Sequence, residues 1–131
     1  MTPEPQFLTL EDVLYIHEKQ LECFGGSQGI RDQRLLESAI TTPQASFGGQ
    51  YVHRDLFEMA AAYSFHIAEN QPFLDGNKRT ALGSALLFLD LNQVELDDPD
   101  GILYQVMIDL SARKLNKHGM AGLLKKLQVG I

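Results

Sequence analysis

The chain has 131 residues, of which 44% are hydrophobic and 21% are charged, and these proportions are typical of a soluble globular protein of one domain. Its formal net charge of −6, from 17 acidic and 11 basic residues, argues against a nucleic-acid-binding surface. One cysteine excludes an internal disulfide framework, and neither a membrane-spanning run nor a signal peptide is apparent, so we expect a single cytoplasmic domain over residues 1–131.

The start of the chain predicts an irregular arm followed by a helix. Residues 1–8 are expected to form a loose arm, unless their two apolar residues, Phe7 and Leu8, attach it to the core. Thr9 and Asp12 have the spacing of a capping box, with Asp in place of the usual Glu or Gln. Apolar residues then recur at helical spacing until a pair of glycines ends the helix.

The next segment predicts a short helix and then a flap. Asp32 is a suitable N-cap for a helix that ends near Thr41. Residues 42–54 break the helical pattern with a proline and a glycine pair, so we expect a β-hairpin-like flap or an extended loop there. Loops of this length in small helical domains are often functional, and a plain connector is the open alternative. The residues of the candidate flap are Phe47, Gly48, Gly49 and Tyr51.

Two long apolar segments, residues 56–68 and 81–91, are expected to form central helices because little polar face remains on either. Asp55 is placed to cap the first helix, and Asn92 to end the second. We expect these two helices, with the turn between them, to be the scaffold of the protein.

Two further helices are predicted after the central pair. Asp98 followed by Pro99 is typical of an N-cap and a first helical residue, and this helix is expected to bury Ile102 together with other apolar residues. Asn116 is expected to start the last helix. The sequence therefore predicts an all-α fold, a bundle of about six helices with a small β-hairpin-like flap.

The chemistry of the chain is concentrated in residues 70–80, which read Asn-Gln-Pro-Phe-Leu-Asp-Gly-Asn-Lys-Arg-Thr. Asp75 and Gly76 predict a turn, after which a helix restarts with Lys78 and Arg79 in its first turn. Two cations at the partly positive N-terminus of a helix cost roughly 0.3–1 kcal/mol each. That cost is explained if a polyanion binds among them on free backbone N–H groups, so the turn predicts a phosphate site.

Each of these residues also has a purely structural interpretation. Asp75 can hold a divalent cation or simply cap the helix. Lys78 and Arg79 can belong to a solvated first turn, and Asn77 can be an ordinary turn residue. Because these residues occur together, we favour a metal-binding carboxylate beside a phosphate site.

Three histidines and the single cysteine are expected to have no part in this site. His17 is predicted on the inner face of the first helix, whereas His53 and His118 are expected to be exposed, and their spacing is not that of metal ligands. Cys23, near a helix end, is expected to be packed.

Residues 71–79 resemble the signature of the Fic/Doc family, whose form is His-x-Phe-x-Asp/Glu-Gly/Ala-Asn-Lys/Gly-Arg. The resemblance extends to residues 29–39 and to the flap, and covers roughly residues 8–91. Lys78 stands where the AMP-transferring members carry Gly, and Leu82 stands where those members carry a second arginine. The chain therefore resembles the Doc (death-on-curing) toxin branch of the family.

This resemblance implies a reaction and a role for each residue of the signature. Asp75 would hold Mg²⁺ on the phosphates of ATP, Gly76 and Asn77 would form the anion-binding turn, and Lys78 and Arg79 would clamp phosphate oxygens. The flap would align an extended segment of a target protein by strand addition. The implied reaction moves the γ-phosphate of ATP to a Ser or Thr hydroxyl of the target, for example a translation factor.

The catalytic histidine of the family is missing, because Gln71 occupies its position. An amide cannot take the proton of the attacking hydroxyl, although it can hydrogen-bond and orient that hydroxyl. General-base catalysis contributes about 10²- to 10⁴-fold, so its loss is expected to leave a slow enzyme rather than a dead one. His66 is a poor substitute because it lies roughly 140° round the helix from Gln71 and about a turn and a half away.

Three functions remain open from the sequence. The first is a weakened protein phosphotransferase that acts as the toxin of a toxin–antitoxin pair. The second is a degenerate family member that binds a nucleotide or a partner protein without chemistry, and the third transfers another phosphate-containing group such as AMP. The sequence lacks the inhibitory helix motif of many Fic proteins, so the resemblance implies control by a separate antitoxin whose flexible segment covers the active-site groove.

Overall fold

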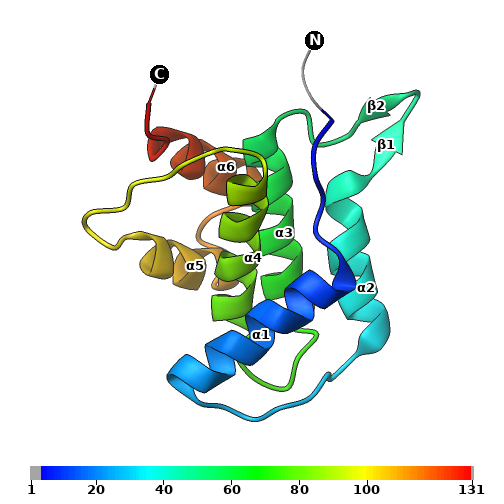
Figure 1. Cartoon of the computed structure of the whole chain (residues 1–131), viewed down its shortest axis with the longest axis vertical. Coiled ribbons are helices and arrows are strands. Elements are labelled where there is room, and N and C mark those ends of the chain that lie inside the picture. Colours follow the sequence, from blue (N-terminus) through cyan, green and yellow to red (C-terminus); the bar gives the residue numbers. More distant parts are fainter. Residues whose placement is uncertain (1–3, 131) are drawn as a thin grey trace.

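The computed structural model describes residues 4–130, which form six α-helices, one 3₁₀ turn and one two-stranded hairpin (Figure 1). This arrangement confirms the predicted all-α fold with a small hairpin. None of the helices described is long and apolar enough to cross a membrane. The elements are α1 (Leu10–Phe24), α2 (Gln33–Thr41), η1 (Thr42–Gln44), β1 (Ser46–Phe47), β2 (Gln50–Tyr51), α3 (Leu56–Asn70), α4 (Asn77–Leu91), α5 (Leu103–Ser111) and α6 (Lys117–Lys126).

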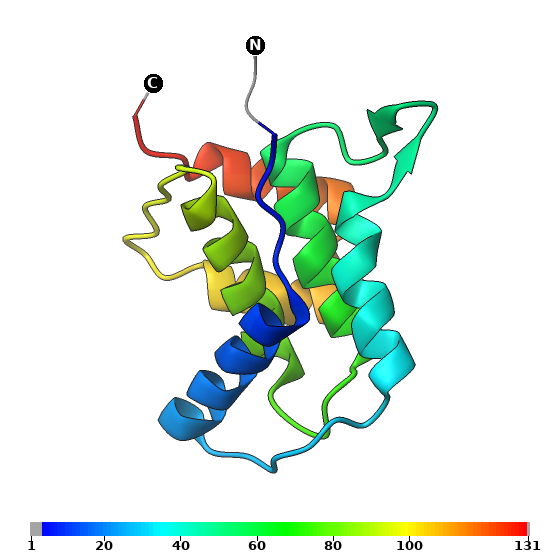
Figure 2. The ribbon, with the colours of Figure 1, turned by 45° about the vertical axis from the view of Figure 1, so that its right-hand side comes forward.

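The central pair is α3 and α4, which lie side by side with a short loop between them (Figures 1 and 2). The buried residues of both helices include several alanines and serines, and such small side chains allow close packing of helix backbones. Helices α2 and α6 pack against α3, α1 packs against α4, and α5 contacts both. The central pair is therefore buried on most sides, as its apolar composition predicts.

Helix α1 crosses α4 at Gly83. A Cβ atom at this position would lie 2.8 Å from Cγ2 of Ile16, which is buried on α1. Only a residue without a side chain allows the two helices to approach this closely. The contact brings the C-terminal half of α1 beside the loop between α3 and α4.

Four of the six helices begin at the N-caps that the sequence predicts. In each case a side-chain oxygen accepts a hydrogen bond from a backbone N–H of the first turn, and α1 has the complete capping box with Asp12. These N-caps are Thr9, Asp32, Asp55 and Asn116.

The start of α5 differs from the prediction. This helix begins at Leu103 rather than at Pro99, after a turn in which Gly101 has a φ of 64°. The Asp98 carboxylate still accepts hydrogen bonds from the backbone N–H groups of Ile102 and Leu103, at 2.9 and 3.0 Å. Ile102 is 39% exposed, not buried as expected, because it lies before the helix.

The expected N-terminal arm is attached to the core over residues 4–8, and the rest of residues 1–8 lies outside the described residues. The backbone N–H of Leu8 donates to the hydroxyl of buried Tyr63 at 2.9 Å. The Phe7 ring stacks on Phe88 and meets the edge of Tyr51.

The hairpin is antiparallel, with Ser46 opposite Tyr51 and Phe47 opposite Gln50. Its two connecting residues, Gly48 and Gly49, have φ values of 60° and 80°, which glycine adopts at low cost in tight hairpin turns. The hairpin lies at the top right of Figure 1, whereas the loop between α3 and α4 lies at the bottom.

Candidate functional site

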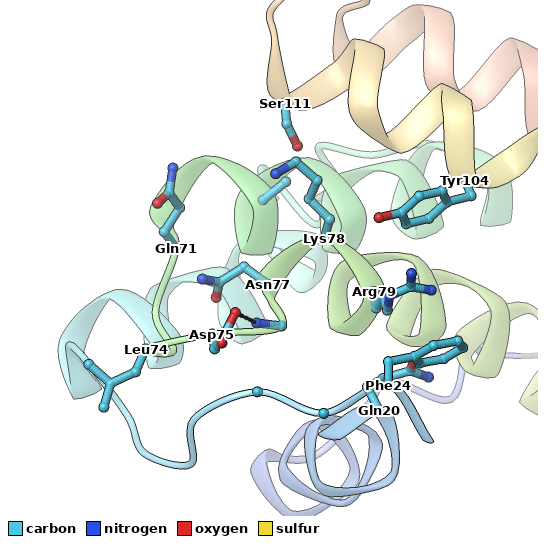
Figure 3. A pocket seen from close by; sticks show the side chains of 14 residues that line it. Gln20, Phe24, Gln71, Leu74, Asp75, Asn77, Lys78, Arg79, Tyr104 and Ser111 are labelled. Atoms are coloured by element: carbon cyan, nitrogen blue, oxygen red, sulfur yellow. Dashed lines mark hydrogen bonds between the residues drawn. The ribbon is translucent and has the colours of Figure 1, made fainter. Parts of the chain in front are cut away.

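The candidate site is a pocket of about 670 Å³ at the end of the bundle where α3 turns into α4 (Figure 3). Its walls come from the end of α1, the loop between α3 and α4, the first turn of α4, and α5. The structure brings together the six signature residues that the sequence singles out: Gln71, Asp75, Gly76, Asn77, Lys78 and Arg79. Its size is within the usual range for small-molecule sites.

The N-terminus of α4 opens into this pocket without a side-chain cap. Its N-cap residue is Gly76, with a φ of 77°, and no side chain accepts a hydrogen bond from the first turn. The first helical hydrogen bond runs from the N–H of Thr80 to the carbonyl of Gly76, at 3.0 Å. The preceding N–H groups of α4 are therefore free to bind an anion.

Asn77 does not cap α4, because its side chain holds the loop instead. Its Oδ1 accepts from the N–H of Phe73 and its Nδ2 donates to the carbonyl of Phe73, both at 3.0 Å. Phe73 is 1% exposed. This double hydrogen bond and the buried ring fix the loop rigidly at its centre.

His17 supports the same loop from α1 and is a site residue that the sequence analysis did not identify. Its Nε2 lies 2.8 Å from the carbonyl oxygen of Asp75, and because a carbonyl only accepts, Nε2 carries the proton and donates. Its ring stacks on Phe73 at a centroid distance of 3.8 Å. The expected position on the inner face of the helix is correct, since His17 is buried.

The connection between α1 and α2, residues 25–32, lies directly against the loop between α3 and α4 (Figure 2). The N–H groups of Arg31 and Asp32 donate to the carbonyl of Pro72, at 2.6 and 3.1 Å, and Ile30 forms a β-bridge with Phe73. Residues 29–32 belong to the resemblance, but their sequence carries no sign of this pairing.

The Arg31 side chain closes the C-terminus of α3. Its Nε donates to the carbonyl of Gln71 and its guanidinium NH2 group to that of Asn70, both at 2.7 Å. Gln71 is the C-cap of α3, with φ 46° and ψ 58°, a left-handed conformation that is unusual for a residue with a side chain. Arg31 therefore holds Gln71, which lines the pocket.

The Asp75 carboxylate is oriented by backbone N–H groups on both sides. One oxygen accepts from the N–H of Gly76 at 3.0 Å, and the other accepts from the N–H of Ser27 at 3.1 Å. A Cβ atom on Gly26 would lie 3.0 Å from the second oxygen, so the connection can approach only because this residue is glycine. Asp75 does not cap the amides of the first turn of α4, and its structural role is to join this loop to the connection between α1 and α2.

The two cations of the first turn have different environments. The Arg79 guanidinium lies between two rings, with its Cζ 3.7 Å from the centroid of Phe24 and 4.5 Å from that of Tyr104 (Figure 3). Lys78 is exposed and extends toward Ser111 at the other side of the pocket. Phe24, Tyr104 and Ser111 were not predicted as site residues.

Comparison with known proteins agrees with this geometry. Residues 7–89 match the Fic/DOC family. This chain belongs to the Fic/DOC family. It is 40% identical over 91 residues to the protein named Toxin Doc of Mycolicibacterium smegmatis, covering 70% of this chain and 68% of that protein. It is 33% identical over 118 residues to the protein named Protein kinase doc of Escherichia phage P1, covering 89% and 91% respectively. Both names confirm the predicted resemblance to the Doc branch.

The flap of this Fic/DOC protein is not at the pocket. The hairpin and Gln71 lie at opposite ends of α3, whose 15 residues span about 22 Å. None of the flap residues lines the pocket. Tyr51 instead packs against Phe7, and its hydroxyl donates to Glu4 at 2.9 Å. The structure therefore places the predicted target-aligning flap away from the pocket, because the hairpin precedes α3 and the pocket follows it.

His66 is separated from the pocket, in agreement with the sequence analysis. Its Nε2 and that of His53 lie 3.1 and 3.0 Å from Nζ of Lys117, which begins α6. Burial, with Lys117 and His53 as further causes, lowers the pKa of His66 to about 4. His53 is 6% exposed rather than exposed as expected, and Cys23 is exposed rather than packed.

Proposed function

We propose that this chain is a cytoplasmic Doc-like toxin that transfers a phosphoryl group from ATP to a Ser or Thr hydroxyl of a target protein. The observation that carries the proposal is the pocket at the uncapped N-terminus of α4, where Lys78 and Arg79 lie beside Asp75. The names of the two relatives, a toxin and a protein kinase, support it.

Phosphate binding would use the free N–H groups of α4 and the turn formed by Gly76 and Asn77. Lys78 and Arg79 would bind phosphate oxygens from the same helix turn. Contacts of Phe73 and His17 hold the loop that carries these groups. Preorganised donors of this kind contribute most of the catalysis in phosphoryl transfer, where positioning and charge stabilisation dominate.

The donor set fits Mg²⁺ bound to a nucleotide. Mg²⁺ is usually held by one or two carboxylates together with phosphate oxygens, and Asp75 supplies one such carboxylate. Within residues 4–130 no group of three or more His, Cys, Asp or Glu residues is close enough to hold a metal ion without a nucleotide. When bound, Mg²⁺ would neutralise charge on the phosphates. The N–H groups of Ser27 and Gly76 would keep the carboxylate pointed at it.

Gln71 would orient the attacking hydroxyl without activating it. In the proposed transfer, the bond between the γ-phosphorus and its bridging oxygen breaks, ADP leaves, and a new bond forms to the target oxygen. The hydroxyl proton then passes to solvent or to the phosphoryl oxygens, because an amide cannot accept it. The reaction should accordingly be slower by about 10²- to 10⁴-fold than with a histidine at this position.

Residues 25–32 would align the target close to the reacting hydroxyl. Ile30 is 40% exposed and forms an isolated β-bridge with Phe73, and a target peptide would add as a strand beside this bridge. A segment aligned on the hairpin instead would lie roughly 20 Å from Gln71. The hairpin would contact only parts of the target that lie further from the reacting hydroxyl.

Control would come from a separate antitoxin, as the resemblance to the Doc branch implies, and one relative is named Toxin Doc. The alternative function is a degenerate protein that binds ATP or a partner without transfer, and Gln71 is the observation that favours it. Transfer of AMP is less well supported, because Leu82 replaces the second arginine of the AMP-transferring members.

The test is transfer of radiolabel from γ-³²P-ATP and, separately, α-³²P-ATP to proteins of a cell lysate. The variants are Gln71→His and Asp75→Asn, with Asp90→Asn as a matched control because Asp90 is an exposed acid of α4 outside the pocket. We expect label from the γ-position only, raised about 10²- to 10⁴-fold by Gln71→His. Asp75→Asn should abolish the label and Asp90→Asn should leave it unchanged.

Other outcomes decide between the alternatives. Label that appears only in Gln71→His would favour the degenerate binding protein, and label from the α-position would favour nucleotidyl transfer. Label that survives in Asp75→Asn would remove the proposed role of this carboxylate.

A further inference from the structure

The feature that the proposed function leaves unexplained is the pair of rings around Arg79. Phe24 is the last residue of α1 and Tyr104 is the second residue of α5, so two separate helices supply the rings. Their centroids lie 3.7 and 4.5 Å from Cζ of Arg79, and Figure 3 shows the guanidinium between them. The two rings are 60% and 40% exposed, so core packing does not account for their position.

Arg79 has no carboxylate partner among residues 4–130. The ion pairs there are Lys19 with Glu22 and Arg113 with Glu69. A carboxylate would orient the guanidinium but would also neutralise it and occupy its N–H donors. Aromatic rings bind the two faces of a guanidinium and leave the donors at its edge free, with the charge intact.

We propose that Phe24 and Tyr104 are positioning residues, which hold the Arg79 guanidinium in place before the nucleotide binds so that its N–H edge is ready for a phosphate. The expected effect of the rings on affinity rests on the proposed nucleotide binding. The first test, which measures the mobility of the Arg79 side chain, needs no nucleotide. A flexible arginine would lose side-chain entropy on binding, whereas one held between two rings has already lost it. The rings therefore raise the affinity for an anion by acting on the guanidinium.

The first measurement is ¹⁵N relaxation of the Arg79 Nε–H group in the protein without nucleotide, assigned from its loss in Arg79→Lys. We expect an ordered side chain that becomes mobile in Phe24→Leu and in Tyr104→Leu, and stays ordered in Phe24→Tyr and Tyr104→Phe. Tyr15→Leu is the matched control, because Tyr15 is an exposed ring of α1 outside the pocket. An Nε–H that is mobile in the unaltered chain, or ordered in both leucine variants, overturns the inference.

The second measurement is the affinity for ATP with Mg²⁺ by titration calorimetry. Each leucine variant should weaken binding by about 2- to 5-fold. In an Arg79→Leu background the same ring substitutions should have no further effect, because the rings act only through the guanidinium. Equal losses in both backgrounds would contradict the positioning role. If the unaltered chain binds no ATP, the proposed function fails, while the relaxation measurement still decides whether the rings hold Arg79.

Discussion

Arg31 and Gln71 show how single residues determine the geometry of the pocket. The chain must leave α3 and reach α4 within six residues, and Gln71 makes the change of direction in a left-handed conformation. This conformation costs a non-glycine residue roughly 1–2 kcal/mol. The charged hydrogen bonds from Arg31 to the last two carbonyl groups offset that cost.

We predict that Arg31→Ala lowers the free energy of unfolding by about 1–2 kcal/mol, because two carbonyl groups at a helix C-terminus lose a charged donor and must rely on water. Urea unfolding measures this loss. Arg34→Ala is the control, because Arg34 is an exposed residue of α2 and its removal should change stability by less than about 0.5 kcal/mol. Equal effects of the two substitutions would show that Arg31 has no special role.

At the scale of elements, the site depends on how closely α1 packs on α4. Helix α1 supplies His17 to the loop and Phe24 to Arg79, and its connection to α2 supplies the N–H that binds Asp75. The close approach is possible because Gly83 presents no side chain to Ile16. Displacement of α1 should therefore disturb the site and the core together.

Two glycine substitutions test this dependence. Ala normally stabilises a helix interior by roughly 0.5–1 kcal/mol relative to Gly. At Gly122 of α6 a Cβ atom would meet nothing within 4 Å, so Gly122→Ala should raise the free energy of unfolding by about that amount. At Gly83 the Cβ atom would lie 2.8 Å from Ile16, so Gly83→Ala should lower it by about 1–3 kcal/mol and weaken ATP binding. Stabilisation by both substitutions would show that the contact between α1 and α4 adapts without cost.

At the scale of the whole molecule, one partly buried cluster joins three distant segments. His53 follows the hairpin, His66 lies on α3, and Lys117 begins α6. An ammonium group only donates, so both imidazole rings accept from Lys117 through Nε2 and must be neutral. Burial and Lys117 lower the pKa of His53, with Glu58 opposing, and burial lowers the pKa of Lys117 itself.

This cluster predicts a loss of stability in mild acid. Burial lowers the pKa of His66 to about 4, whereas an unfolded histidine has a pKa of about 6.5. The unfolded chain therefore binds more protons between these values, so the stability is complete above pH 6.5 and is lost as the pH falls toward 4. After allowance for partial exposure to solvent, the free energy of unfolding should fall by roughly 1–2 kcal/mol from pH 7 to pH 5.

Urea unfolding at several pH values measures this slope. His66→Gln removes the titrating group and should flatten the slope. His118→Gln removes an exposed histidine and should leave the slope as it is. An unchanged slope in His66→Gln would assign the acid sensitivity to other groups.

The sequence by itself determines the helices, most of their ends and the turn that carries the site. Thr9, Asp32, Asp55 and Asn116 act on backbone groups within a few residues of themselves, so their effect is visible in the local sequence. The start of α5 was missed because Asp98 caps it across an intervening turn. The Doc branch was recognisable because its motif is one contiguous stretch at residues 71–79.

The tertiary structure alone decides what surrounds that turn. His17 and Ser27 reach Asp75 across 58 and 48 residues of sequence, and Phe24 and Tyr104 reach Arg79 from two other helices. It also places the hairpin far from the pocket, because the length of α3 separates them. Hydrophobic packing of the helices sets these distances, and it depends on side chains that are far apart in the chain, so no local pattern records them.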